Sequence, residues 1–296
     1  MAKKLSAEER LEKAKEEKKA IDLAKLKVKD IITNHRVING NSKRMFSLKD
    51  NQISLIVTSP PYFNAKEYSQ WKSLDSYLED MKKIFKECFR VLRGGRRFCL
   101  NISDIPEKGE SGVRWISLGS KLLKIAEEVG FELADRIFWF KTPLKGFQYG
   151  SLPFPPSPLI ADSIEYLYIL RKPGKRDYSH VEKNERDASR LSREEYMEYT
   201  KQIWSIRRVR LNQNVDGHIA PFPEELPYRC IKLYSFVGET ILDPFGGRGT
   251  TTKMAIETKR NSVLYEINKD YIDLIKQYLD IEQKKLSEDK IFFENE

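Results

Sequence analysis

Short apolar runs alternate along the chain with longer segments in which apolar residues recur every three or four positions. The short runs predict strands and the 3.6-residue period predicts helices. The expected strands cover residues 53–58, 97–102, 133–140, 164–171, 238–243 and 262–266. The expected helices cover residues 74–92, 117–128, a stretch ending near 234, 250–257 and 270–284. Strands that alternate with helices indicate an α/β fold with a mainly parallel sheet covered on both faces.

Glycine and proline predict where several of these elements end. The first expected strand runs into Ser59-Pro60-Pro61-Tyr62, and the two prolines should stop it in a rigid, extended turn. Gly94 and Gly95 predict the C-cap of the helix that begins near Leu74.

Polar composition divides the chain into four parts: residues 1–29, 30–172, 173–215 and 216–296. The first part is mostly Lys, Glu, Ala and Leu, which predicts a polar helix, either solvated or lying as a basic arm on a phosphate backbone. The third part is a polar insert, richest in charged residues between 173 and 203. It is expected to be either a target-contacting element or a solvated surface excursion.

Composition narrows the class of protein. With 296 residues, 40% of them hydrophobic, the chain is long enough for one α/β core. It has neither an apolar run of about 18 residues nor an apolar segment at its N-terminus, so no membrane span or secretion signal is expected. The formal net charge of +9 favours encounter with nucleic acid.

Cysteine and histidine usage suggests neither disulfides nor a metal site. Cys88, Cys99 and Cys230 lie far apart in apolar segments, which predicts reduced core residues and a cytoplasmic protein. His180 and His218 have no partner at ligand spacing, so no metal is expected.

A glycine-rich turn follows the strand that ends at Asp243. It reads Pro244-Phe-Gly-Gly-Arg-Gly-Thr-Thr251, and glycines between a strand and a helix let a ligand approach the backbone closely. The pattern is not a P-loop, since no Gly-Lys-Ser/Thr ends it. Glu266 ends the next strand at the same sheet edge, where a carboxylate can accept both hydroxyls of a ribose. Together these features predict a nucleoside-cofactor site.

The turn Thr58-Ser-Pro-Pro-Tyr62 carries a second kind of chemistry. The exocyclic amino nitrogen of cytosine or adenine is a poor nucleophile because its lone pair is delocalised into the ring. The Ser59 hydroxyl and the Pro60 carbonyl can accept its hydrogens and so free the lone pair. Tyr62 offers a flat face on which an extruded base can stack.

The two motifs together resemble the β-class amino-methyltransferases, in which the catalytic motif precedes the cofactor motif. The resemblance covers roughly residues 37–280 and implies S-adenosylmethionine as cofactor. It also implies a Rossmann-like seven-stranded sheet with a circularly permuted motif order. In these terms, residues 30–172 would form the catalytic half of the domain and 216–296 the cofactor-binding half.

The resemblance also assigns roles to individual residues. The expected catalytic residues are Ser59, Pro60, Pro61 and Tyr62. The expected cofactor-binding residues are Asp243, Pro244, Phe245, Gly247, Gly249, Thr250, Glu266 and Phe222, with Pro223 and Glu224 beside the last of these. Asn41 and Thr58 are further candidates for cofactor contact.

A serine before Pro-Pro-Tyr resembles the cytosine-N4 members, whereas adenine-N6 members more often carry Asp or Asn. The leading expectation is direct methyl transfer to N4 of a flipped or single-stranded cytosine in DNA. Cytidine N4 in ribosomal RNA and adenine N6 in DNA remain alternatives, as do a non-catalytic nucleic-acid-binding module and a small-molecule methyltransferase.

The sequence leaves two roles possible for one aromatic segment. Lys141 and Lys145 lie beside Phe138, Trp139, Phe140 and Phe147, a set that either lines the path of the nucleic acid or packs in the core.

Overall fold

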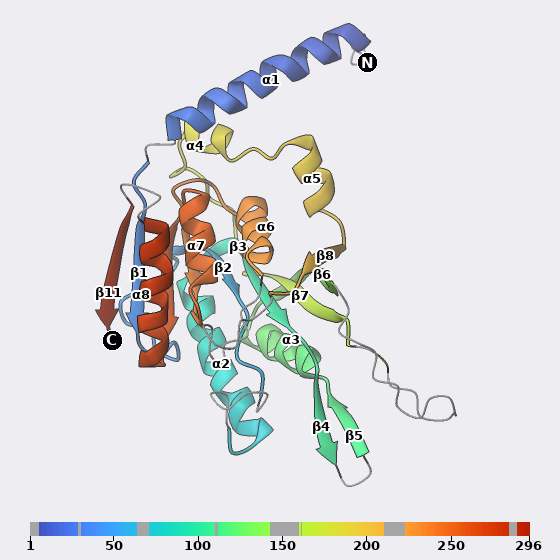
Figure 1. Ribbon diagram of the computed structural model, residues 1–296, viewed down its shortest axis with the longest axis vertical. Helices are drawn as coiled ribbons and strands as arrows, with labels where there is room; N and C mark the ends of the chain where they lie inside the picture. Colours follow the sequence, from blue (N-terminus) through green and yellow to red (C-terminus); the bar gives the residue numbers. More distant parts are fainter. Residues whose placement is uncertain are drawn as a thin grey trace.

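The computed structural model describes residues 6–28, 31–63, 71–109, 112–142, 160, 162–209, 223–283 and 289–296 (Figure 1). Its helices are α1 (Ala7–Val28), α2 (Leu74–Val91), α3 (Leu118–Val129), α4 (Lys183–Ala188), α5 (Arg193–Tyr199), α6 (Glu225–Tyr234), α7 (Thr250–Glu257) and α8 (Lys269–Gln283). Its strands are β1 (Asn34–Asn39), β2 (Ile53–Thr58), β3 (Leu92–Ile102), β4 (Ile105–Gly109), β5 (Gly112–Ile116), β6 (Glu132–Thr142), β7 (Ile164–Arg171), β8 (Ile203–Arg207), β9 (Thr240–Asp243), β10 (Asn261–Glu266) and β11 (Lys290–Asn295). None of the helices in the described ranges is long and apolar enough to cross a bilayer.

The central sheet has the strand order β11-β1-β10-β9-β2-β3-β7-β6-β8. All neighbours are parallel except β7, which runs antiparallel to both β3 and β6. The α/β class and the mainly parallel sheet are therefore confirmed. The expected seven strands are not, because β11 and β8 add one strand at each edge. Both edge strands are short and half exposed, so neither has the buried apolar run that marks a central strand in the sequence.

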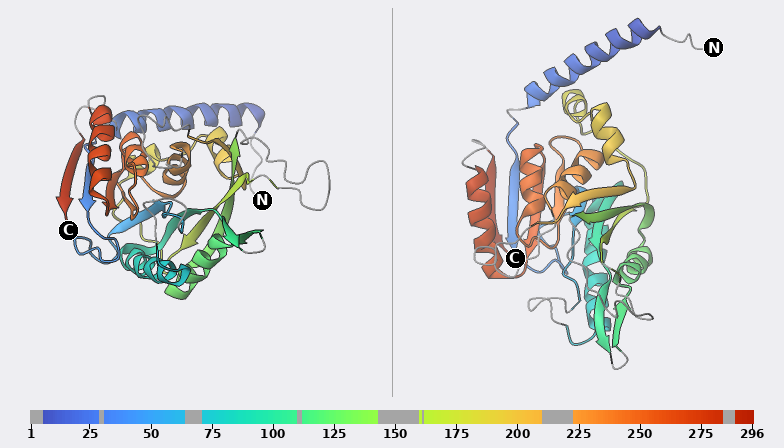
Figure 2. Two further views of the ribbon diagram at one scale, coloured as in Figure 1. Left: turned by 60° about the horizontal axis from the view of Figure 1, so that its bottom comes forward. Right: turned by 45° about the vertical axis from the view of Figure 1, so that its right-hand side comes forward.

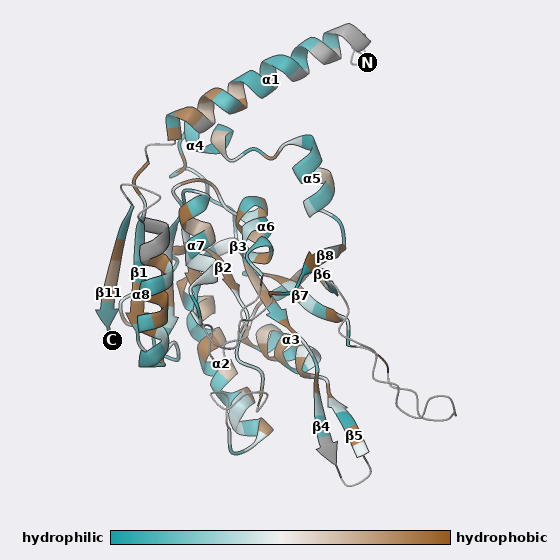
Figure 3. Ribbon diagram, in the orientation of Figure 1, coloured by the Kyte–Doolittle hydropathy of each residue, from teal (hydrophilic) through white to brown (hydrophobic). Residues whose placement is uncertain are grey.

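Helices cover both faces of the sheet. The faces are clearest in β2, where successive side chains point to opposite sides. Ile56 packs with the core under α2 and α3, whereas Leu55 and Val57 pack with the core under α6 and α7. All three cysteines are buried and free, as predicted. Figure 3 shows the hydrophobic residues gathered on the central strands and on the helix faces that meet them.

The predicted glycine cap of α2 is wrong. The helix ends at Val91, its C-cap is Leu92 in an extended conformation, and β3 begins there without a loop. Gly94 and Gly95 therefore lie inside the strand. Gly95 has a φ of +74°, and a Cβ there would come within 3.1 Å of the Arg176 backbone nitrogen. Gly95 allows a close approach of the chain after β7, and neither glycine ends the helix.

The two ends of the parallel strands carry different segments of the chain. β2, β3, β9 and β10 all end at one edge, which we call the carboxyl edge, and begin at the other, the amino edge. The antiparallel β7 ends at the amino edge and β8 begins there. The part of the polar insert that precedes β8, with α4 and α5, is therefore held at the amino edge, opposite the end of β2 (Figure 2).

A two-stranded hairpin, β4–β5, follows β3 at the carboxyl edge and projects from the body (Figure 1). This hairpin was not predicted from the sequence. Trp115 and Val113 on β5 are both more than half exposed.

The N-terminal helix predicted from residues 1–29 is present as α1. Only its last turns join the body, where Ala24 and Val28 pack against Ala188 of α4 and Val237.

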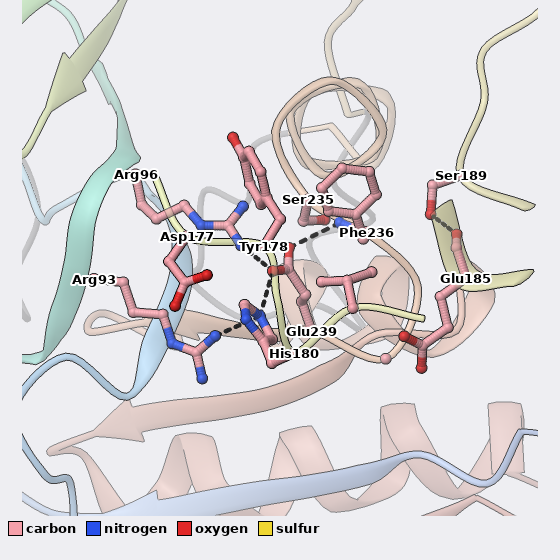
Figure 4. Close-up of polar contacts among 12 residues, drawn as sticks. Arg93, Arg96, Asp177, Tyr178, His180, Glu185, Ser189, Ser235, Phe236 and Glu239 are labelled. Carbon is pink, nitrogen blue, oxygen red and sulfur yellow. Dashed lines mark hydrogen bonds and ion pairs between the residues drawn. The ribbon is translucent and has the colours of Figure 1, made fainter. Parts of the chain in front are cut away.

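A buried ion pair anchors the insert to the amino edge (Figure 4). The Arg96 guanidinium pairs with the Glu239 carboxylate, and both side chains are almost fully buried. His180 of the insert lies 3.0 Å from Glu239 Oε1, and the backbone N–H of Phe236 donates to Oε2 over 2.9 Å. Glu239 thus joins β3, the insert and the turn before β9.

Candidate active site

Thr58 and Asp243 bring the two sequence motifs together at the carboxyl edge. They end β2 and β9, which are parallel neighbours in the sheet. The Thr58 hydroxyl donates to Asp243 Oδ1 over 2.5 Å, and both side chains are buried. The catalytic turn that follows Thr58 therefore starts directly beside the glycine-rich turn that follows Asp243.

The hydroxyl of Tyr62 is buried and hydrogen-bonded. It donates to Glu165 Oε2 over 2.8 Å, and the Ser59 hydroxyl hydrogen-bonds to the Tyr62 oxygen. Burial, with the nearby Glu165 carboxylate, raises the pKa of Tyr62 well above its usual value, so the phenol stays protonated. Pro60 is buried, while Ser59, Pro61 and Tyr62 are partly buried.

Three donors converge on Glu165. Besides Tyr62, the Asn101 amide nitrogen donates to Glu165 Oε2 over 2.7 Å, and the Lys141 ammonium lies 3.5 Å from Oε1. Asn101 and Lys141 are the last residues but one of β3 and β6, and Glu165 is the second residue of the antiparallel β7, so all three lie at the carboxyl edge. Neither Glu165 nor Asn101 was predicted from the sequence.

The glycine turn is shaped by its backbone. Gly249 is the N-cap of α7 with a φ of +85°, and Gly247 has a φ of +52°. The Gly247 N–H donates to Glu266 Oε2 over 2.8 Å, which ties the turn to the end of β10. Gly246 was not among the predicted residues. A Cβ on it would lie 2.3 Å from Leu264 Cδ2, so no larger residue fits there.

The two acids of this edge are both buried. Burial raises the pKa of Asp243 to about 7, and hydrogen bonds from Thr58, Thr251 and the Phe245 N–H offset part of the rise. Burial also raises the pKa of Glu266, against the hydrogen bonds donated by the backbone N–H groups of Asn268 and Gly247.

These acids fit a nucleoside cofactor. Buried carboxylates without a salt-bridge partner are costly unless a ligand supplies hydrogen bonds. Asp243 Oδ2 is buried and has no hydrogen-bond partner among the described residues. Glu266 accepts one backbone N–H on each carboxylate oxygen, which leaves lone pairs for the two hydroxyls of a ribose. Among the residues that the structure describes, no group of three or more His, Cys, Asp or Glu side chains could hold a metal ion.

Other predicted residues lie at or near this edge. Asn41 is exposed just after β1, next to Gly40, whose N–H donates to the Glu266 carbonyl. Pro244, Phe245 and Thr250 belong to the glycine turn and the start of α7. Phe222, Lys145, Phe147 and His218 lie outside the described residues.

The aromatic segment of β6 is divided between two roles. Trp139 is buried and its indole N–H donates to the Ile206 carbonyl, so it belongs to the core. Lys141 faces the acidic side chains of the carboxyl edge, where it donates to Asp162 over 2.7 Å.

Residues 53–277 match the DNA methylase family of N6 and N4 amino-methyltransferases. The chain belongs to this family. It is 33% identical over 291 residues to the Type II methyltransferase M.MjaI of Methanocaldococcus jannaschii, an alignment that covers 88% of this chain and 96% of the relative. The family recognised in the sequence is thereby confirmed.

Solved structures agree on the fold. TTHA0409 of Thermus thermophilus, in complex with S-adenosyl-L-methionine, aligns with a TM-score of 0.73 and 25% identity over 88% of this chain and 98% of that one. The cytosine-N4-specific PvuII DNA methyltransferase aligns with a TM-score of 0.61 over 88% of this chain and 95% of that one, and at 20% identity it supports the fold alone. The predicted cofactor agrees with the ligand of TTHA0409.

Proposed function

We propose that this chain transfers a methyl group from S-adenosylmethionine to the N4 amino nitrogen of cytosine in DNA. The observation that carries the proposal is the hydrogen bond between Thr58 and Asp243. It sets a turn suited to an amino group beside a turn suited to a nucleoside cofactor. Donor and acceptor can then meet at one edge of the sheet.

The cofactor side of the site is assigned to the glycine turn and its acids. Glu266 would accept the ribose hydroxyls, and the backbone of residues 243–250 would pass close to the ligand. S-adenosylmethionine supplies an electrophilic methyl group on a sulfonium. Phe222, Asn41 and Thr58 stay predictions as cofactor contacts, the last acting through Asp243.

The base side of the site is assigned to the catalytic turn. Ser59 and the Pro60 carbonyl would accept the hydrogens of the amino group, which releases the nitrogen lone pair for attack on the methyl carbon. The carbon–sulfur bond would break as the carbon–nitrogen bond forms, the thioether S-adenosylhomocysteine would leave, and the surplus amino proton would pass to Ser59 or to solvent. Tyr62 would stack on the base, which leaves the duplex to reach it. No covalent adduct is needed because the nucleophile is an amino nitrogen.

The choice of target rests on two supports. Membership in a family of DNA methylases favours DNA over ribosomal RNA. Ser59 before Pro-Pro-Tyr favours cytosine N4 over adenine N6, because a serine at that position resembles the cytosine-N4 members. Both remain part of the proposal.

Target recognition by the polar insert stays a prediction. The position of the insert in the fold is relevant to that prediction. The part of the insert with α4 and α5 lies at the amino edge, and only the end of β8 reaches the carboxyl edge, where the catalytic turn and the β4–β5 hairpin lie. A DNA held at the catalytic turn would therefore meet the hairpin before it met α4 or α5.

The catalytic assignment is tested by the double substitution Pro60→Ala with Tyr62→Ala. Methyl transfer to DNA should be lost while S-adenosylmethionine binding, measured by calorimetry, is retained. Tyr196→Ala on α5 is the matched control, because this tyrosine is exposed at the amino edge. Turnover retained by the double variant would contradict the assignment.

A further inference from the structure

The direction of hydrogen bonding behind the catalytic turn can be read from the chemistry of Glu165. A carboxylate surrounded by donors can only accept hydrogen bonds. Tyr62, Asn101 and Lys141 all present donors to it, at 2.8, 2.7 and 3.5 Å. The side chain is only 13% exposed, so these protein groups largely replace water around it.

The hydrogen bond from Tyr62 to Glu165 also fixes the direction of the hydrogen bond between Tyr62 and Ser59. Because the Tyr62 hydroxyl hydrogen is committed to Glu165, its oxygen is left to accept. The Ser59 hydroxyl hydrogen-bonds to that oxygen and lowers the pKa of Tyr62, as expected of a donor. Ser59 Oγ is then left with lone pairs and no hydrogen to offer on its other side.

Asn101 is oriented by the same carboxylate. Its amide nitrogen must face Glu165, since two oxygens would repel each other. The amide nitrogen also donates to Ser59 Oγ over 3.4 Å, so the serine oxygen accepts from Asn101 and the serine hydrogen stays available for Tyr62. The Asn101 Oδ1 atom is buried and has no partner among the described residues. A second acceptor is thus set near the catalytic turn.

We propose that Glu165 is the positioning residue that makes Ser59 and Asn101 acceptors and so selects a target base with an amino group over one with a carbonyl. Cytosine and uracil differ at this position, as N4 amino against O4 carbonyl. An acceptor facing a carbonyl leaves two oxygens opposed and unpaired, which is costly in a site without water. The inference deepens the proposed function and rests on it.

Glu165→Gln tests the inference because it keeps the size of the side chain but can donate. A glutamine amide facing Tyr62 lets the phenol accept, and Ser59 is no longer held as an acceptor. The experiment measures the affinity for two duplexes that differ only at the base the enzyme methylates. One duplex carries cytosine at that position and the other carries uracil. If the methylated base proves to be adenine, the matched pair is adenine and hypoxanthine.

The wild type should prefer the amino base by about tenfold or more, and Glu165→Gln should reduce the preference to about twofold. S-adenosylmethionine affinity should stay unchanged. A general loss of structure would lower both affinities without changing their ratio. Tyr62→Phe, which removes the connecting hydroxyl but keeps the ring, should also lose the preference. Glu132→Gln, in an exposed ion pair with Arg171 near the amino edge, should keep it.

Two outcomes overturn the inference in distinguishable ways. Methyl transfer by the wild type together with an unchanged base preference in Glu165→Gln and Tyr62→Phe overturns this inference alone. No transfer by the wild type to any DNA overturns the proposed function, and the inference falls with it.

Discussion

The Thr58 hydroxyl donates to the Asp243 carboxylate over 2.5 Å, so the ends of β2 and β9 share one buried hydrogen bond. The bond joins the strand before the Ser-Pro-Pro-Tyr turn to the strand before the glycine turn. It also lowers the pKa of Asp243 against the effect of burial. The position of the Ser-Pro-Pro-Tyr turn and the ionisation of the Asp243 carboxyl are therefore coupled.

Replacing Thr58 by valine should weaken cofactor binding. Valine has nearly the same shape but no hydroxyl, so Asp243 loses a buried donor, at a cost of about 1–3 kcal/mol. We expect the affinity for S-adenosylmethionine, measured by calorimetry, to fall by roughly tenfold or more, while Thr58→Ser keeps most of it. Equal affinities of the two variants would show that the hydroxyl is not needed.

Cofactor binding should depend on pH through Asp243. Its pKa in the folded chain is about 7, above that of an exposed aspartate, so the carboxyl is protonated at lower pH. If the ionised form accepts hydrogen bonds from the cofactor, affinity rises up to about tenfold per pH unit until pH 7 and then levels off. Calorimetry between pH 5.5 and 8.5 should show this rise in the wild type. The same slope in Asp243→Asn would assign the effect to another group.

The same shift predicts a stability change in the absence of cofactor. Because the folded pKa lies above the unfolded one, the folded state binds the extra proton. The free energy of unfolding should therefore fall as pH rises from about 4 to 7, by about 4 kcal/mol from this group alone. The difference between wild type and Asp243→Asn in urea unfolding isolates it from other titrating groups.

Gly246→Ala should destabilise the fold. A Cβ at this position would lie 2.3 Å from Leu264 Cδ2 on β10, so the strand or the turn must move. Overpacking of this kind costs about 1–3 kcal/mol. Gly94→Ala is the control, because its Cβ would meet only ordinary contacts, the nearest at 3.6 Å. Urea unfolding that finds the two variants equally stable would contradict the steric account.

Much of the fold could be predicted because burial leaves a mark in the sequence. The runs at 53–58 and 164–171 are apolar since both faces of these strands are covered, and they were predicted at the observed positions. β8 and β11 were missed because they are short edge strands: β8 alternates exposed and buried residues over five positions, and β11 has no buried residue among its six. Gly94 and Gly95 were misassigned because the loop that approaches them lies some 80 residues away in the chain.

The site was predictable only where it follows a parallel strand. Thr58, Asp243 and Glu266 end strands that the sequence marks, so their meeting at one edge follows from the fold class. Glu165 lies at the start of a strand, a position that reaches the same edge only because β7 runs antiparallel. Nothing local in the sequence states that direction. Asn101 was missed because its chemistry depends on Glu165 as its partner.

The buried ion pair between Arg96 and Glu239 at the amino edge should contribute to the stability of the fold and not to methyl transfer. Glu239→Gln leaves the buried Arg96 guanidinium without a charged partner, which costs about 3–5 kcal/mol. Glu132→Gln, in the exposed pair with Arg171, should cost less than about 1 kcal/mol. Urea unfolding measures both. Under conditions where Glu239→Gln is folded, a loss of S-adenosylmethionine affinity would contradict the separation of the two edges.

Transfer of labelled methyl from S-adenosylmethionine to duplex DNA, single-stranded DNA and ribosomal RNA tests the central claim most directly. The purified wild-type chain is incubated with each substrate, and the products are digested to nucleosides and identified by mass. We predict N4-methyl-deoxycytidine from DNA. N6-methyl-deoxyadenosine would keep the family and correct the base, whereas N4-methylcytidine from RNA alone, or no label in any DNA with the cofactor bound, would contradict the claim.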